Sequence, residues 1–160
     1  MENKRSVLDV ADFFLSKESM SAKKLQRLVY YAYSWTLAFL NEKETELDNR
    51  LFPEKIEAWV HGPVVPVLYQ ELKHYGWDNI PKVTDFSASI FYDDELDLME
   101  QVWIVYGAYT ANELEMMSHM GTPWINARKD IPPFEPSSNI IDDKDIFRFF
   151  NEQAASSFLI

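Results

Sequence analysis

The stretch Trp59-Val60-His61-Gly62-Pro63-Val64-Val65-Pro66-Val67-Leu68-Tyr69 decides the architecture of this chain. It holds two prolines and a glycine within five residues, so it cannot lie inside a regular helix. The alternating run over residues 56–61 predicts a strand, and the apolar spacing over residues 65–72 predicts a helix that stops at Gly76. We therefore interpret His61-Gly62-Pro63 as a stiff strand-to-helix corner that leads into a helix with proline in its first turn.

The composition predicts a single folded domain. The chain has 160 residues, of which 47% are hydrophobic and 15% aromatic, enough for a sizeable core. It has no apolar run near the roughly 20 residues that a membrane span needs, and no signal-peptide core follows its first residues. There is no cysteine, so disulfides and thiolate metal sites are excluded. These features favour a cytoplasmic protein without a membrane partner.

The charge narrows the choice of partners. The formal net charge is −11, which opposes binding to the phosphates of nucleic acids. It favours a basic partner, or serves solubility alone. The first two predicted helices and their turn also fit a DNA-binding helix-turn-helix, but the second of them lacks the exposed face that a recognition helix needs. A nucleic-acid partner is therefore disfavoured.

Helical periodicity dominates the N-terminal third. Ser21 predicts the start of a helix that continues to Leu40 and is apolar nearly all round, which is typical of a central, buried helix. Its first turns carry Lys23, Lys24 and Arg27, which we interpret as a solvated basic face.

The remaining elements complete a mainly α fold. Further helix starts are indicated at Ser6 with Asp9, at the acids 93–95, at Thr110 with Glu113, at Thr122 before Pro123, and at Asp142. The β-prone residues 87–92 are expected to pair with residues 56–61. The sequence thus predicts one compact helical domain over residues 1–153, with a small two- or three-stranded β element around residues 56–61 and 87–92. Residues 154–160 are predicted to form a C-terminal tail.

Three histidines, His61, His74 and His119, are the main candidates for chemistry. His61 and His119 lie at predicted element boundaries, where a histidine can fix a turn, act as a general base beside an acid, or join carboxylates around a metal. The chain has no His-x-x-x-His pair, no Gly-rich phosphate loop and no nucleophile elbow. A structural role is favoured, so the sequence predicts no catalytic residue, no metal and no cofactor.

Three stretches together resemble the signature of one family. Lys24-Leu25-Gln26-Arg27-Leu28-Val29-Tyr30-Tyr31-Ala32 resembles its KLQKLLYYA helix. Ala58 to Pro66, with Leu68-Tyr69 and Tyr75-Gly76, resembles its AWxHGPVxPxLY…YG element. Leu114, Ser118-His119 and Pro123-Trp124 resemble its L…TH…PW element. In this order, over roughly residues 5–150, they resemble the Panacea domain of SocA-like and phage GepA-like proteins. The chain departs from the pattern only mildly, with Arg27 for lysine and Ser118 for threonine.

The resemblance implies a helical antitoxin that neutralises a co-encoded toxin by direct binding, in bacterial or phage genomes. A proteolytic adaptor that delivers the toxin to a bacterial protease is the alternative, and a small hydrolase using His61 or His119 is a further one. The family implies no enzyme activity. Its motif positions are expected to hold the scaffold: Leu25, Leu28, Tyr31, Trp59, His61, Gly62, Pro63, Pro66, Tyr69, Gly76, His119, Pro123 and Trp124. We expect His61 to brace its corner against the segment from His119 to Trp124.

Overall fold

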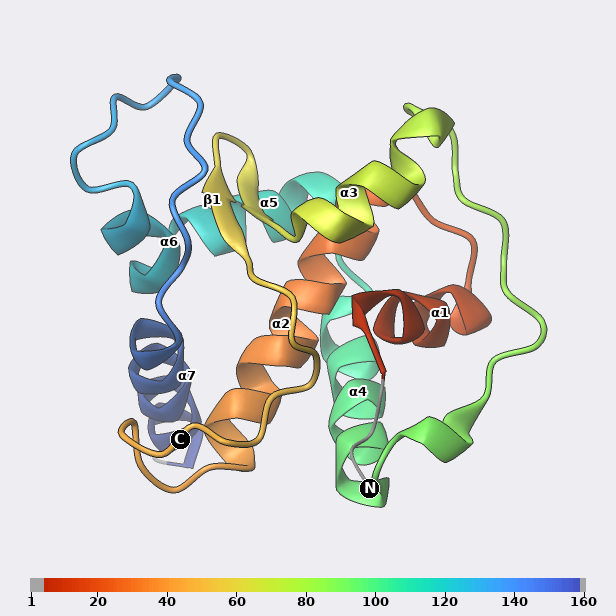
Figure 1. Cartoon of the computed structure of the whole chain (residues 1–160), viewed down its shortest axis with the longest axis horizontal. Helices are drawn as coiled ribbons and strands as arrows, with labels where there is room; N and C mark the ends of the chain where they lie inside the picture. The colour runs from red at the N-terminus through yellow and green to blue at the C-terminus, as the bar shows by residue number, and fades with distance from the viewer. Residues whose placement is uncertain (1–4, 159–160) are drawn as a thin grey trace.

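Helices packed around one central helix make up the structure, a computed structural model that describes residues 5–158 (Figure 1). In chain order, the elements of this range are α1 (Val7–Lys17), α2 (Ala22–Phe39), β1 (Glu57–Trp59), β2 (Gly62–Val64), α3 (Pro66–Leu72), the short 3-10 helices η1 (Lys73–Tyr75) and η2 (Ala88–Ile90), α4 (Asp93–Tyr106), α5 (Ala111–His119), α6 (Thr122–Ala127) and α7 (Asp143–Phe158). The predicted mainly α class with a small β element is confirmed. No helix of the described range is long and apolar enough to span a membrane.

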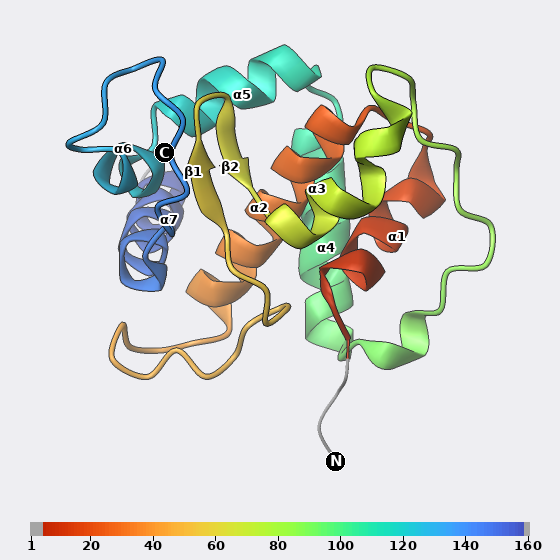
Figure 2. The ribbon, with the colours of Figure 1, turned by 45° about the horizontal axis from the view of Figure 1, so that its top comes forward.

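The central position predicted for α2 is confirmed. This helix contacts α1, α4, α5, α7 and β2. Figures 1 and 2 show it running from an N-terminal end beside α3 down to a position between α4 and α7. Every residue from 25 to 34 is buried, so the helix presents no continuous solvent face over that length. Burial of this apolar surface is the main stabilising contribution to the fold.

Side-chain caps fix three helix starts where the sequence predicts them. Ser6 and Asp9 form a capping box at the start of α1. Ser21 Oγ accepts a hydrogen bond from the backbone N–H of Lys24 at the start of α2. Thr110 and Glu113 form a second capping box at α5. Each cap satisfies backbone donors that have no partner within the helix.

The predicted strand-to-helix corner is wrong in its geometry, because the chain reverses before it enters the helix. Glu57 pairs with Val64 and Trp59 with Gly62 in an antiparallel register, so residues 60 and 61 form a hairpin turn. Gly62 makes the reversal possible with φ +135°, a backbone conformation that other residues rarely adopt. The helix begins only at Pro66, in the first-turn position expected for a proline.

The pairing of residues 56–61 with residues 87–92 is also wrong. The second strand of the sheet is β2, and residues 88–90 form η2 instead. The N–H of Phe91 donates to the carbonyl of Ala88, so this segment satisfies its backbone locally and needs no strand partner. A different segment lies along β1, where Ala58 N–H donates to the Asn139 carbonyl.

The C-terminal boundaries differ from those predicted. The cap of α6 is Gly121, with Thr122 as the first helical residue and Pro123 as the second. Asp142 accepts the N–H of Lys144 before α7, as predicted. However, α7 continues to Phe158, so residues 154–158 of the expected tail are helical. Residues 159–160 lie outside the described range, as do residues 1–4.

Candidate interaction site

Two adjacent side chains of α2 close the outer edge of β2. Arg27 Nη2 donates to the His61 carbonyl at 2.6 Å, and Arg27 Nη1 donates to the Pro63 carbonyl at 2.7 Å. Gln26 pairs with both backbone groups of Val65, donating at 3.2 Å to its carbonyl and accepting at 2.9 Å from its N–H. Pro63 has no N–H to offer. The edge therefore has its backbone groups satisfied by side chains and offers no template to another strand.

Gly62 is required here for a second reason besides its positive φ. A Cβ atom at this position would lie 2.8 Å from Arg27 Nε and 2.9 Å from Arg27 Cζ. Both atoms belong to a guanidinium that is itself fixed by two hydrogen bonds, so it cannot move aside freely. The close approach of backbone and guanidinium depends on the missing side chain.

The β1 edge of the hairpin is held from the other side by α6 and the loop that follows it. Trp124 Nε1 donates to the Trp59 carbonyl at 2.8 Å. Arg128 is only 5% exposed and donates at 2.9 Å to the Ala58 carbonyl. Its second amino group donates to the carbonyls of Pro132 and Glu135. The hairpin is thus held between α2 and α6.

The sequence stretches that carry the resemblance therefore meet at one place. Leu25 and Leu28 are fully buried in α2, and Tyr31 stacks on Tyr106 with ring centroids 4.2 Å apart. Trp59 meets Tyr69 edge to face at 5.0 Å, and Pro123 is buried at the start of α6. Gly76 ends η1 with φ +57°.

The interpretation of the basic cluster as a solvated face is wrong. Arg27 is 2% exposed, and Lys24 Nζ donates to the Gly107 carbonyl. Lys23 Nζ lies 2.6 Å from a carboxylate oxygen of Glu115. Burial lowers the pKa of Arg27 to about 10, although the Glu115 charge partly opposes this. All three cations are used to hold neighbouring elements against α2.

The two boundary histidines differ from each other. The His61 side chain is 77% exposed, and its Nδ1 lies 3.5 Å from Glu115 Oε2. His119 stacks on Trp124 with centroids 4.2 Å apart, and burial lowers its pKa. The two segments do meet, but the contact joins Trp124 to the Trp59 carbonyl. The expected contact between the corner and this segment is thus present, but it is made by backbone groups: the His61 backbone faces His119 and its carbonyl is bonded by Arg27, while the His61 side chain lies near Glu115.

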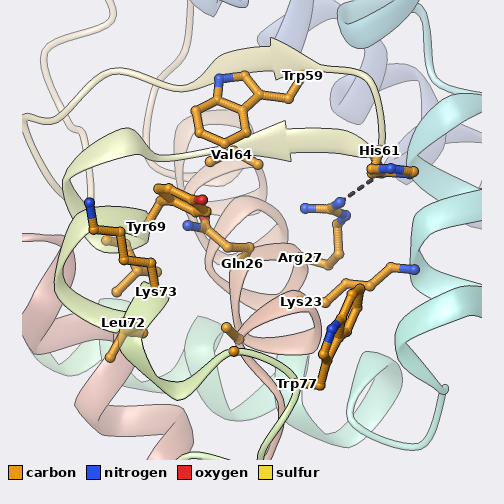
Figure 3. A pocket seen from close by; sticks show the side chains of 13 residues that line it. Lys23, Gln26, Arg27, Trp59, His61, Val64, Tyr69, Leu72, Lys73 and Trp77 are labelled. Atoms are coloured by element: carbon orange, nitrogen blue, oxygen red, sulfur yellow. Dashed lines mark hydrogen bonds between the residues drawn. The ribbon is translucent and has the colours of Figure 1, made fainter. Parts of the chain in front are cut away.

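A groove lies on the exposed face between α2, the hairpin and α3. Its volume is about 380 Å³, and Figure 3 shows the side chains that line it. Most of the lining surface is apolar, and the residues that line it include Trp59, Val64, Tyr69 and Leu72. Trp77 stands on its rim and is 97% exposed. The shape and chemistry suit a site that receives apolar side chains.

The groove has residues that sequence reasoning did not assign to a site. Trp77 follows the predicted helix stop at Gly76, where the sequence indicates only a loop. Gln26 lies within the quoted helix motif, yet no periodicity indicates that it pairs with Val65. His74, the third histidine, lies in η1 and contacts the ring of Tyr75. Among the described residues, no group of three or more His, Asp or Glu side chains is placed to hold a metal ion.

Comparison with known proteins supports the motifs. The family model described as "Antitoxin SocA-like, Panacea domain" matches residues 25–125. This range includes the hairpin, the two α2 side chains that close the β2 edge, and Trp124. Searches of curated proteins and of solved structures found no match.

Proposed function

Since the chain belongs to the SocA-like Panacea domain family of antitoxins, we propose that it neutralises a co-encoded toxin by binding it directly. The observation that carries this proposal is the family match, which covers the hairpin and the helix that supports it. In this proposal the binding takes place in the cytoplasm, where the products of the two neighbouring genes are synthesised.

The division of labour among the residues supports a binding role. The motif side chains Gln26, Arg27 and Trp124 are engaged with backbone groups of the same chain. These hydrogen bonds hold the hairpin in place. Beside them lies an open, mostly apolar groove with an exposed tryptophan on its rim, the type of surface that anchors protein partners. A framework of this kind can stay the same while its surface is adapted to a particular toxin.

We propose further that neutralisation involves no catalysis by this chain. His119 is stacked against Trp124, and the carboxylate nearest to His61 is also paired with Lys23. Replacing both His61 and His119 by alanine tests this. Retained neutralisation agrees with a binding function. Lost neutralisation with unchanged thermal stability and unchanged toxin binding would favour the hydrolase alternative.

Co-expression provides the main test. The adjacent open reading frame is expressed from an inducible promoter, with and without this chain, and colony formation is counted. We expect the neighbour to stop growth when alone and to be tolerated when this chain is present. A neighbour that is harmless alone contradicts the proposal. Measuring the half-life of the toxin in the same cells separates the two antitoxin routes, because delivery to a protease shortens it and masking does not.

A further inference from the structure

We propose that the groove between α2, the hairpin and α3 is the toxin-binding surface, and that it receives a short apolar segment flanked by a carboxylate. This inference rests on the proposed function and identifies the surface and the partner chemistry that the function requires.

The closed edge of β2 determines how a partner can be recognised. A peptide that adds a strand to a sheet needs free N–H and carbonyl groups along the edge. Here Arg27 and Gln26 occupy the carbonyls of His61, Pro63 and Val65, and Gln26 also accepts the Val65 N–H. The other edge is taken by the segment around Asn139. The partner must therefore be recognised through its side chains and not by backbone pairing.

The rim of the groove supplies the apolar anchor. Trp77 is 97% exposed and Tyr69 is 42% exposed, although both border an apolar hollow. Figure 3 shows Trp77 at one end of the groove and Tyr69 near Lys73 at the other. Exposed aromatic side chains around a concave apolar surface are the usual centres of binding energy in protein interfaces. A hollow of about 380 Å³ admits a few side chains and not a whole domain.

The charge of the groove indicates which charged group of the partner lies beside its apolar side chains. Its basic lining residues are Lys23, Arg27, His61 and Lys73, and no Asp or Glu lines it, although the chain carries a net charge of −11. Arg27 is committed to backbone carbonyls and Lys23 to Glu115, a pair that also faces His61. Within the described residues, the Lys73 side chain makes no hydrogen bond or ion pair. Lys73 is therefore the cation left for a carboxylate of the partner.

Binding measurements with the adjacent gene product test the surface. The probe is the purified toxin, inactivated by mutation, titrated calorimetrically into this chain. We expect Trp77→Ala to raise Kd by about tenfold or more, because it removes an aromatic anchor. Lys73→Glu is expected to raise Kd by a similar factor. Lys73→Gln should raise it less and should also weaken the dependence of Kd on salt concentration, since the charge pair is gone.

Matched controls lie on other faces. Ile104→Ala removes an exposed apolar side chain from α4, and Lys129→Glu reverses an exposed cation beyond α6. Both should leave Kd within about twofold of the wild type. If Trp77→Ala and Lys73→Glu bind like the wild type while the wild type neutralises the toxin, the groove is not the binding surface and the proposed function stands. A wild type that does not bind the toxin overturns both proposals.

Discussion

The two edges of the hairpin are both held by a buried arginine, but in different ways. On the β2 side, Arg27 bonds two carbonyls within three residues of each other, and neighbouring Gln26 completes the edge. On the β1 side, Arg128 and Trp124 each bond one backbone carbonyl, and Ala58 pairs with Asn139 as in a strand. One edge thus depends on a single helical turn of α2, whereas the other depends on several separate segments.

The difference shows where the family signature is structurally concentrated. The matched residues 25–125 contain every side chain that closes the β2 edge. On the β1 side they contain Trp124 but not Arg128 or Asn139. The β2 edge also borders the groove, so loss of a contact at this edge distorts the proposed binding surface directly. Loss of one contact should therefore cost more at the β2 edge than at the β1 edge.

The largest effect is expected from Arg27→Ala. The substitution leaves the carbonyls of His61 and Pro63 without a donor, and Pro63 is buried where water does not replace it. Each unsatisfied buried group costs about 1–3 kcal/mol, so the free energy of unfolding should fall by about 3 kcal/mol. Urea unfolding followed by circular dichroism measures it. Arg27→Lys, which keeps the charge but cannot span both carbonyls, should recover only part of the loss. An Arg27→Ala variant as stable as the wild type would contradict the role given to this edge.

The burial of Arg27 was outside the reach of sequence analysis for a physical reason. Basic residues in the first turns of a helix are usually solvated, and nothing local distinguishes Arg27 from Lys23. Arg27 is buried by the hairpin, which the sequence does not predict. The Pro63 carbonyl that Arg27 bonds there lies 36 residues away in sequence. The hairpin was missed because prolines and glycine mark a turn without fixing its direction.

Local signals were predictive where a single segment decides the outcome. The capping box of Ser6 and Asp9 and the all-round apolar pattern of α2 depend on neighbours in the chain, and both are confirmed. The failure at residues 87–92 follows the same logic, because β-propensity acts only when a partner edge is available. The groove joins α2, α3 and the hairpin, so only the tertiary arrangement makes it visible.

A smaller loss is expected from Gly62→Ala, which crowds the β2 edge without removing a donor. The new methyl would lie 2.8 Å from Arg27 Nε, at a backbone φ of +135°. We expect a loss of about 2 kcal/mol in the free energy of unfolding. In the double variant Gly62→Ala/Arg27→Ala the methyl no longer meets the guanidinium. The double variant should therefore lose less free energy of unfolding than the sum of the two single-variant losses. Strict additivity would show that the crowding is unimportant.

The β1 edge should respond less to loss of its own arginine. Arg128→Ala releases the Ala58 carbonyl, which is buried, but the carbonyls of Pro132 and Glu135 lie in an exposed loop where water can replace the donor. The expected loss is about 1.5 kcal/mol, against about 3 kcal/mol for Arg27→Ala. Unfolding in urea under the same conditions gives the comparison. An equal or larger loss for Arg128→Ala would reverse the ranking of the two edges.

Removing a single hydrogen bond at the β1 edge should cost still less. Trp124→Phe deletes the donor to the Trp59 carbonyl and retains an aromatic ring beside His119. The free energy of unfolding should fall by about 1 kcal/mol. Trp35→Phe is a useful comparison, because Trp35 likewise donates one hydrogen bond, to the Tyr106 hydroxyl, but far from the hairpin. Both variants should unfold with similar losses, whereas only Trp124→Phe should loosen the hairpin, as measured by faster amide exchange at Ala58 and Trp59.

The smallest effect concerns pH and acts on the β1 side through His119. Burial lowers the pKa of His119 from its ordinary 6.5, while the His61 backbone and the Glu115 charge oppose this and the Arg27 and His61 charges reinforce it. The unfolded chain therefore takes up the proton first as pH falls. The stability contributed by neutral His119 is full above pH 6.5 and is lost as pH falls through the lowered pKa. His119→Gln should accordingly lose less stability than the wild type between pH 7 and about 5, measured by urea unfolding at each pH. His74→Gln, an exposed substitution in the middle of η1, serves as the matched control. A His119→Gln profile parallel to that of the wild type would show that the β1 edge does not respond to protonation of this side chain.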